Sequence, residues 1–75
     1  MNKQRRKEIA KAIDLIQQAR EILESVKDEE QEAFDNLPEN LQSAESGEKM
    51  EWCISGIEDF LEYLDTDELQ GIIDA

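Results

Sequence analysis

The chain has 75 residues, of which 39% are hydrophobic and 37% charged, and its 20 Asp and Glu against 8 Lys and Arg give a net charge of −12. One cysteine and no histidine exclude an internal disulfide and the usual Cys/His zinc sites, and the regular spacing of the apolar residues excludes a disordered chain. A chain this short is one domain at most and buries only a modest core, so we expect it to associate with other chains.

The first predicted element is a long amphipathic helix at about residues 4–35. In a heptad register with Ile9 at position a, most d positions hold alanine, which predicts close approach by a partner helix. Glu30 falls at an a position. Either the stripe ends near Val26, which we favour, or Glu30 is a polar group at a helix interface. The apolar stripe consists of Ile9, Ala12, Ile13, Ile16, Ala19, Leu23 and Val26, widened by Leu15 and Ile22.

Charge is distributed unevenly along the chain. Residues 1–27 hold seven bases and four acids, about +3, whereas residues 28–75 hold one base and sixteen acids, about −15. The two arms of a hairpin would therefore attract each other, leaving a small cationic end. Arg5, Arg6 and Lys7 are candidate anion-binding residues, although a solvated helix end paired with neighbouring acids explains them more simply. The net negative charge opposes binding to duplex nucleic acid.

A connector is predicted at about residues 36–46. Asn36 and Glu39 are spaced as in a capping box, with Pro38 early in a short helical turn that runs to Gln42. The simplest interpretation is a well-capped hairpin corner. Exposed structured connectors also often carry function, so we take this one, with one tryptophan of the second helix, as a candidate binding surface. Its residues are Glu30, Phe34, Asn36, Pro38, Glu39, Asn40, Gln42 and Trp52.

The second predicted helix covers about residues 47–64, with Ser43 or Ser46 as its N-cap. Gly56 inside it predicts a close helix crossing, because glycine there is otherwise unfavourable. Cys53 is expected to be a small core residue rather than a reactive thiol. In DTDE, residues 65–68, a capping signature either starts a short last helix to about residue 73 or lies within a continuing second helix. The face expected to be buried consists of Met50, Cys53, Ile54, Ile57, Phe60, Leu61 and Leu64, flanked by Trp52 and Tyr63.

These elements predict an all-α fold, a single helical domain over residues 1–75. It is an antiparallel helical hairpin with a short helical connector. Because two wide apolar stripes cannot cover each other completely, we expect hairpins to pair into a four-helix bundle. The first choice is a homodimer, and the alternative is a higher oligomer. No signal peptide or membrane span is predicted, which indicates a cytoplasmic protein. The sequence contains no nucleophile–base constellation and no phosphate-binding loop, so we expect neither an enzyme nor a cofactor.

Residues 28–52, DEEQEAFDNLPENLQSAESGEKMEW, resemble a motif of small acidic helical proteins that are common in phages and prophages. The resemblance implies a small accessory protein, many of which act against host factors. Trp52 and Cys53 depart from the group's pattern. We therefore expect stoichiometric binding and inhibition of a host protein, for example a defence protein. The alternatives are an oligomer that sequesters a small anionic ligand such as a nucleotide, and an acidic mimic of nucleic acid.

Overall fold

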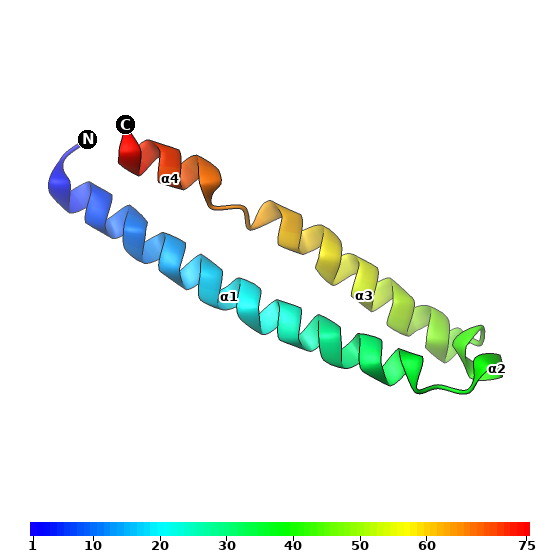
Figure 1. Ribbon diagram of the computed structural model, residues 1–75. Coiled ribbons are helices and arrows are strands. Elements are labelled where there is room, and N and C mark those ends of the chain that lie inside the picture. Colours follow the sequence, from blue (N-terminus) through cyan, green and yellow to red (C-terminus); the bar gives the residue numbers. More distant parts are fainter.

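The computed structural model describes all of residues 1–75, which form four helices and no strand. They are α1 (Lys3–Asp35), α2 (Glu39–Gln42), α3 (Glu45–Tyr63) and α4 (Asp67–Asp74). Helices α3 and α4 return along α1, and the two termini lie at the same end (Figure 1). The predicted all-α fold and its helical hairpin are confirmed.

The ends of α1 are fixed by local hydrogen bonds. At its start, the backbone N–H of Arg5 donates to the Asn2 side chain at 2.9 Å, so Asn2 is the N-cap. At its end, Asn36 continues the helical backbone and its N–H donates to the Glu32 carbonyl at 3.0 Å. The predicted capping box that starts at Asn36 is therefore wrong. An N-cap requires an extended backbone, and the residue that has one here is Pro38, with ψ of 146°.

One row of α1 residues, spaced alternately three and four apart, faces the returning helices, and we call it the inner row. The only buried apolar side chains are those of Ile13 in α1 and of Ile54 and Leu61 in α3, so the core is thin. Glu30 is half-buried in this row. Of the two interpretations of Glu30, the structure therefore agrees with the less favoured one, a polar group at a helix interface. The inner row consists of Arg6, Ile9, Ile13, Ile16, Arg20, Leu23, Lys27, Glu30 and Phe34.

The predicted d positions of α1 do not face α3. Ala12, Ala19, Val26 and Ala33 are all exposed, and the inner row instead pairs each a position with the residue four further on. The physical reason is the area that each choice buries. Turning Ile13 rather than Ala12 toward the returning helices removes more apolar surface from water.

The start of α3 differs from its prediction. Its N-cap is Ala44, which makes no side-chain hydrogen bond, so neither Ser43 nor Ser46 caps it. Instead, Gly47 packs against α2. A Cβ on Gly47 would lie 2.6 Å from the Leu41 carbonyl oxygen and closer still to that of Gln42. Glycine is required here because two backbones touch.

The last helix is separate from the second. The backbone leaves helical geometry at Leu64, and the Asp65 side chain accepts a hydrogen bond of 2.9 Å from the N–H of Asp67. This turn redirects the chain into α4, which packs against the N-terminal half of α1. Of the two alternatives, the separate short helix is therefore the one observed.

Two arginines of the inner row bind the C-terminal ends of the returning helices. Arg20 Nη1 donates to the carbonyl oxygens of Leu61 and Leu64, at 3.1 and 3.2 Å. Arg6 Nη2 donates to the backbone oxygen of Ala75 at 3.3 Å. Both contacts place a cation at the negative end of a helix dipole. The Leu61 carbonyl also accepts a hydrogen bond from the backbone N–H of Leu64.

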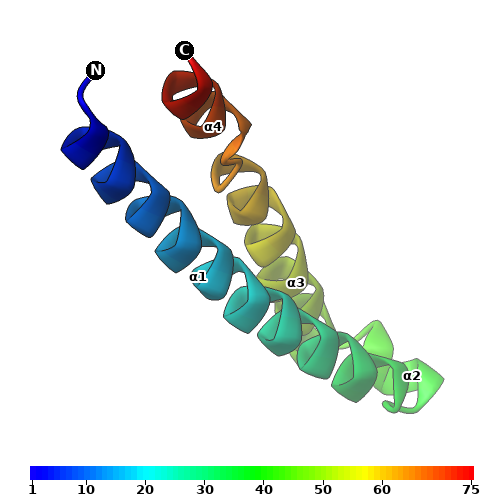
Figure 2. The same cartoon turned by 60° about the vertical axis from the view of Figure 1, so that its left-hand side comes forward.

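The hairpin is a rod two helices thick (Figure 2). Its Cα atoms extend over 58 × 15 × 13 Å, with a radius of gyration of 17.6 Å. A compact chain of this length has a radius of gyration of about 11 Å. Every helix therefore has one side covered and its remaining surface open to solvent.

Candidate functional site

The most distinctive surface of the hairpin is an apolar groove between α1 and α3. It has a volume of about 370 Å³ and is open along its length. Leu23 lines it from the α1 side, and Trp52, Cys53, Gly56, Ile57 and Phe60 line it from α3. Trp52 is 77% exposed and Phe60 is 52% exposed. These aromatic side chains are available to a partner.

A second apolar row runs along α1 beside this groove, and we call it the outer row. Ile22 in this row is 65% exposed and Leu15 is 56% exposed. The spacing of three and four residues keeps the row on one side of the helix, about 100° from the inner row. The outer row consists of Ala12, Leu15, Ala19, Ile22 and Val26, all exposed.

The outer row and the groove lie on the same side of the hairpin. Leu23, the α1 residue that lines the groove, lies on the side of the inner row that is nearer the outer row. In α3, the exposed residues of the groove lie about 120° from the buried Ile54 and Leu61, toward the same side. Together they form one surface, the outer apolar face, which also reaches the exposed Tyr63.

The opposite side of the hairpin is polar, and we call it the acidic flank. Here a shallow depression is lined mainly by Gln31 of α1 and by Glu51, Ser55 and Glu58 of α3. Helical periodicity adds Glu62 on α3 to this side. The hairpin therefore has two chemically different faces, one apolar and one carboxylate-rich.

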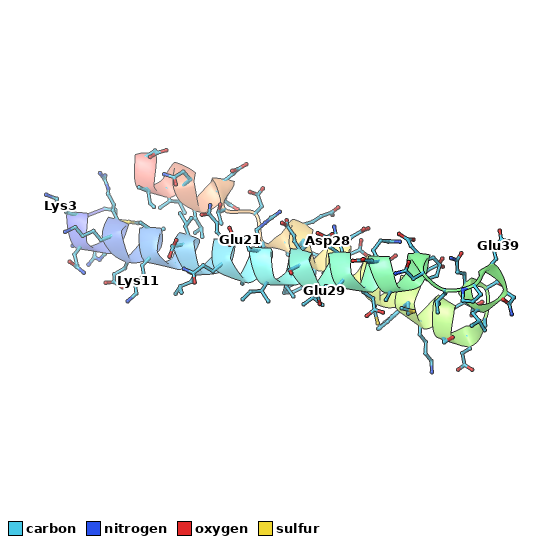
Figure 3. The ribbon with its side chains drawn as sticks, turned by 60° about the horizontal axis from the view of Figure 1, so that its bottom comes forward. Lys3, Lys11, Glu21, Asp28, Glu29 and Glu39 are labelled. Carbon is cyan, nitrogen blue, oxygen red and sulfur yellow. The ribbon has the colours of Figure 1, made fainter.

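The predicted binding residues of the connector fall into two groups. Asn36, Pro38, Glu39 and Asn40 are exposed around α2, at the tip of the rod (Figure 3, where Glu39 is labelled). Gln42 is half-buried and has a structural role, because its Nε2 donates to the carbonyl oxygens of Phe34 and Leu37 at 3.3 and 3.1 Å.

Trp52 and Glu30 lie apart from that exposed group. Trp52 belongs to the groove and Glu30 to the inner row, where Phe34 also lies half-buried. The structure thus distributes the predicted site residues over the connector tip, the groove and the helix interface rather than bringing them to one point.

The predicted anion-binding residues lie at the other end of the rod. Arg5, Arg6 and Lys7 are consecutive helical residues, so their side chains leave the helix about 100° apart. Arg6 points inward to the C-terminal end of α4, whereas Arg5 and Lys7 are exposed. Helix α4 lies at this same end of the rod (Figure 1), and its acids are Asp67, Glu68 and Asp74. The small cationic end predicted from the sequence is therefore offset by these acids.

Cys53 and Gly56 do not lie where the sequence analysis expected. Cys53 is exposed in the groove rather than buried in the core, because α3 turns Ile54 inward instead. A Cβ on Gly56 would meet no atom within 4 Å, so no close crossing occurs at this glycine within the hairpin. Periodicity on α3 could not distinguish the buried row from the groove, since both are apolar.

No group of three or more Cys, Asp or Glu side chains is arranged to hold a metal ion. No helix has the length and apolar character needed to cross a membrane. The chain matches no family model, no characterised protein and no solved structure in the comparisons made with it.

Proposed function

We propose that this protein is a non-enzymatic accessory protein that works as a homodimer and binds a host protein stoichiometrically. In the phage context implied by the connector motif, it acts in the cytoplasm of a bacterial host and inhibits its target. The observation that carries the proposal is the segregation of the surface. A large apolar face and an exposed structured tip are maintained on a chain with a thin core, and such exposed surfaces mark interaction sites.

The connector tip is the proposed contact for the host protein. Glu39 and Asn40 are exposed, and neither side chain makes a hydrogen bond within the chain. Truncating these two side chains is expected to leave the hairpin intact, since Gln42 and Gly47 hold the corner independently. A partner that binds here would contact side chains that a rigid turn holds in place.

The test is affinity capture from bacterial lysate, with the captured protein then purified and its stoichiometry measured by calorimetry. The variant Glu39→Ala/Asn40→Ala is expected to lose the captured protein, whereas Gln17→Ala, on an exposed polar position of α1, is expected to retain it. A captured protein that binds the wild-type chain and both variants with equal affinity contradicts the proposed contact. If no stoichiometric partner is found, the proposed function itself is wrong.

The acidic flank supports a second candidate function, mimicry of a nucleic-acid surface. The flank places Glu51, Glu58 and Glu62 along one side of α3, where a basic protein surface would meet a row of negative charge. Binding of that kind weakens steeply with added salt, because screening removes charge–charge attraction. A captured partner whose affinity is insensitive to salt, and to Glu51→Gln/Glu58→Gln, excludes mimicry.

The sequestration of a small anion has less support. Its three candidate residues diverge around α1, and Arg6 is already bound to the end of α4. Thermal-shift measurements against nucleotides would detect such a ligand, since binding to the native state raises its stability.

A further inference from the structure

We propose that a second copy of this chain covers the outer apolar face, with the two hairpins packed face to face and antiparallel. The inference deepens the proposed function, since it rests on the homodimer and names its interface. Area, surface shape and charge each support this occupant and this orientation.

The exposed area fits a dimer. The chain exposes 5830 Å², whereas a compact monomer of its 8.7 kDa exposes about 4,700 Å². The excess of roughly 1,100 Å² per chain is similar to the 800 Å² or so that each partner buries in a standard protein interface. Covering the outer apolar face with a copy of itself removes this excess and completes a four-helix arrangement.

The shape of the face suits pairing with itself. Along the outer row, the small Ala12 and Ala19 alternate with the larger Leu15 and Ile22, so two such rows can interlock. Gly56 provides a further point where a helix can approach closely, and nothing within the hairpin uses it. A two-fold axis makes the same surface serve both copies, and large aromatic residues such as Phe60 are enriched in the centres of such interfaces.

Charge selects the orientation. The connector half of the rod, residues 27–51, holds nine acids and two bases, about −7, whereas residues 1–11 and 65–75 hold five of each and are neutral. Lys3 and Lys11 lie at one end of the rod and Glu39 at the other (Figure 3). Parallel hairpins would place the two connector halves together. Antiparallel hairpins place each connector half beside the neutral end of its partner and so reduce the repulsion.

The first experiment measures mass in solution by light scattering or sedimentation equilibrium. The wild-type chain is expected at twice its 8.7 kDa mass, and Ile22→Glu at the mass of one chain. Gln17→Glu is the matched control, because it adds the same charge at an exposed position of α1 outside the outer row, and it is expected to remain dimeric. A dimeric Ile22→Glu or a monomeric wild-type chain would overturn the proposal.

A second variant guards against misfolding of the first. Ala19→Gln keeps a good helix former at an exposed position but fills the space into which a partner row would interlock. It is expected to be monomeric while its circular dichroism stays helical. If it remains fully dimeric, the outer row is not the interface.

The second experiment measures orientation with spin labels on Asn40→Cys in a Cys53→Ser background. Because Cys53 lies in the outer apolar face, the dimeric mass of this variant is confirmed first. Antiparallel hairpins place the two connectors at opposite ends of a rod 58 Å long, so the distance between labels is expected to approach that length. Parallel hairpins would place them about 20 Å apart, or two helix diameters, and that result would overturn the antiparallel arrangement. A monomeric wild-type chain that still captures a host protein would overturn this inference and the homodimer on which it rests, and would leave host binding standing. A dimer that captures no host protein would overturn only the proposed host-binding function.

Discussion

The inner and outer rows of α1 both carry large aliphatic side chains, but these have opposite surroundings. Ile13 in the inner row is 7% exposed, and Ile22, nine residues further on in the outer row, is 65% exposed. Both rows have helical spacing, and both carry Ile and Leu, although only the inner row also contains charged residues. The difference shows that amphipathic periodicity states how much apolar surface a helix carries, whereas the number of neighbouring helices decides how much of it is covered.

The largest contrast is expected between buried and groove residues of α3. Ile54→Ala should lower the free energy of unfolding by about 2–5 kcal/mol, because the thin core cannot close the cavity. Phe60→Ala, on the outer apolar face, should lower it by about 1 kcal/mol or less in the monomer. Urea denaturation at concentrations where the chain is monomeric would measure both. Equal losses would mean that the two rows are not distinct.

Substituting alanine at the two glycines of α3 should change the stability of the monomer in opposite directions. Gly47→Ala should destabilise the chain by about 1–3 kcal/mol, because its Cβ would collide with the backbone of α2. Gly56→Ala should stabilise the monomer by up to about 1 kcal/mol through helix propensity, since the space around it is open. In the dimer, the same Gly56→Ala change should weaken association. Thermal unfolding over a range of protein concentrations separates the two effects. Stabilisation at Gly47 would contradict the close approach of the two backbones.

Removing the charge of an inner-row arginine should also lower the free energy of unfolding more than removing the charge of an exposed lysine. Arg20→Met keeps much of the side-chain volume but removes the two hydrogen bonds to the end of α3, which should cost about 1–2 kcal/mol given its partial exposure. Lys11→Met, on an exposed position of the same helix, should change the free energy of unfolding little. Thermal denaturation of both variants checks the contrast, which fails if Lys11→Met is the more damaging change.

The smallest expected effect concerns salt. Each chain carries a net charge of −12, so added salt should screen repulsion between copies and tighten the dimer, by less than about tenfold. The dissociation constant at low and high sodium chloride would show this. Weaker association in salt would mean that charge pairs, rather than the outer apolar face, hold the dimer together.

Much of the fold follows from local rules. The first helix, expected at about residues 4–35, spans Lys3–Asp35, because no glycine or proline interrupts it and Pro38 follows. The short turn before Gln42 was also expected. Among the local signals, those for the caps of the connector failed: Asn36 ends α1, and Ala44 precedes α3 without a side-chain cap. Side-chain capping preferences gave way there to the close packing of Gly47 against α2.

The candidate site was harder to predict than the fold. The connector residues were proposed because they are richer in specific polar types than a turn needs, and Trp52 because it departs from the pattern of the phage group. Their binding role stays a prediction. The role of Arg20 was missed, since a base within an amphipathic helix carries no signal that it will meet the end of another helix. Cys53 and Phe60 were assigned to the core because α3 is apolar over more than one face.

The sequence by itself determined the helices, their order, the turn between them and the separation of charge along the chain, because these depend on residues close in sequence. Only the tertiary structure decided which apolar row each helix buries and which it leaves exposed. That choice depends on the area gained when two particular helices pack, and α3 covers only one side of α1. The outer apolar face is what remains after that choice.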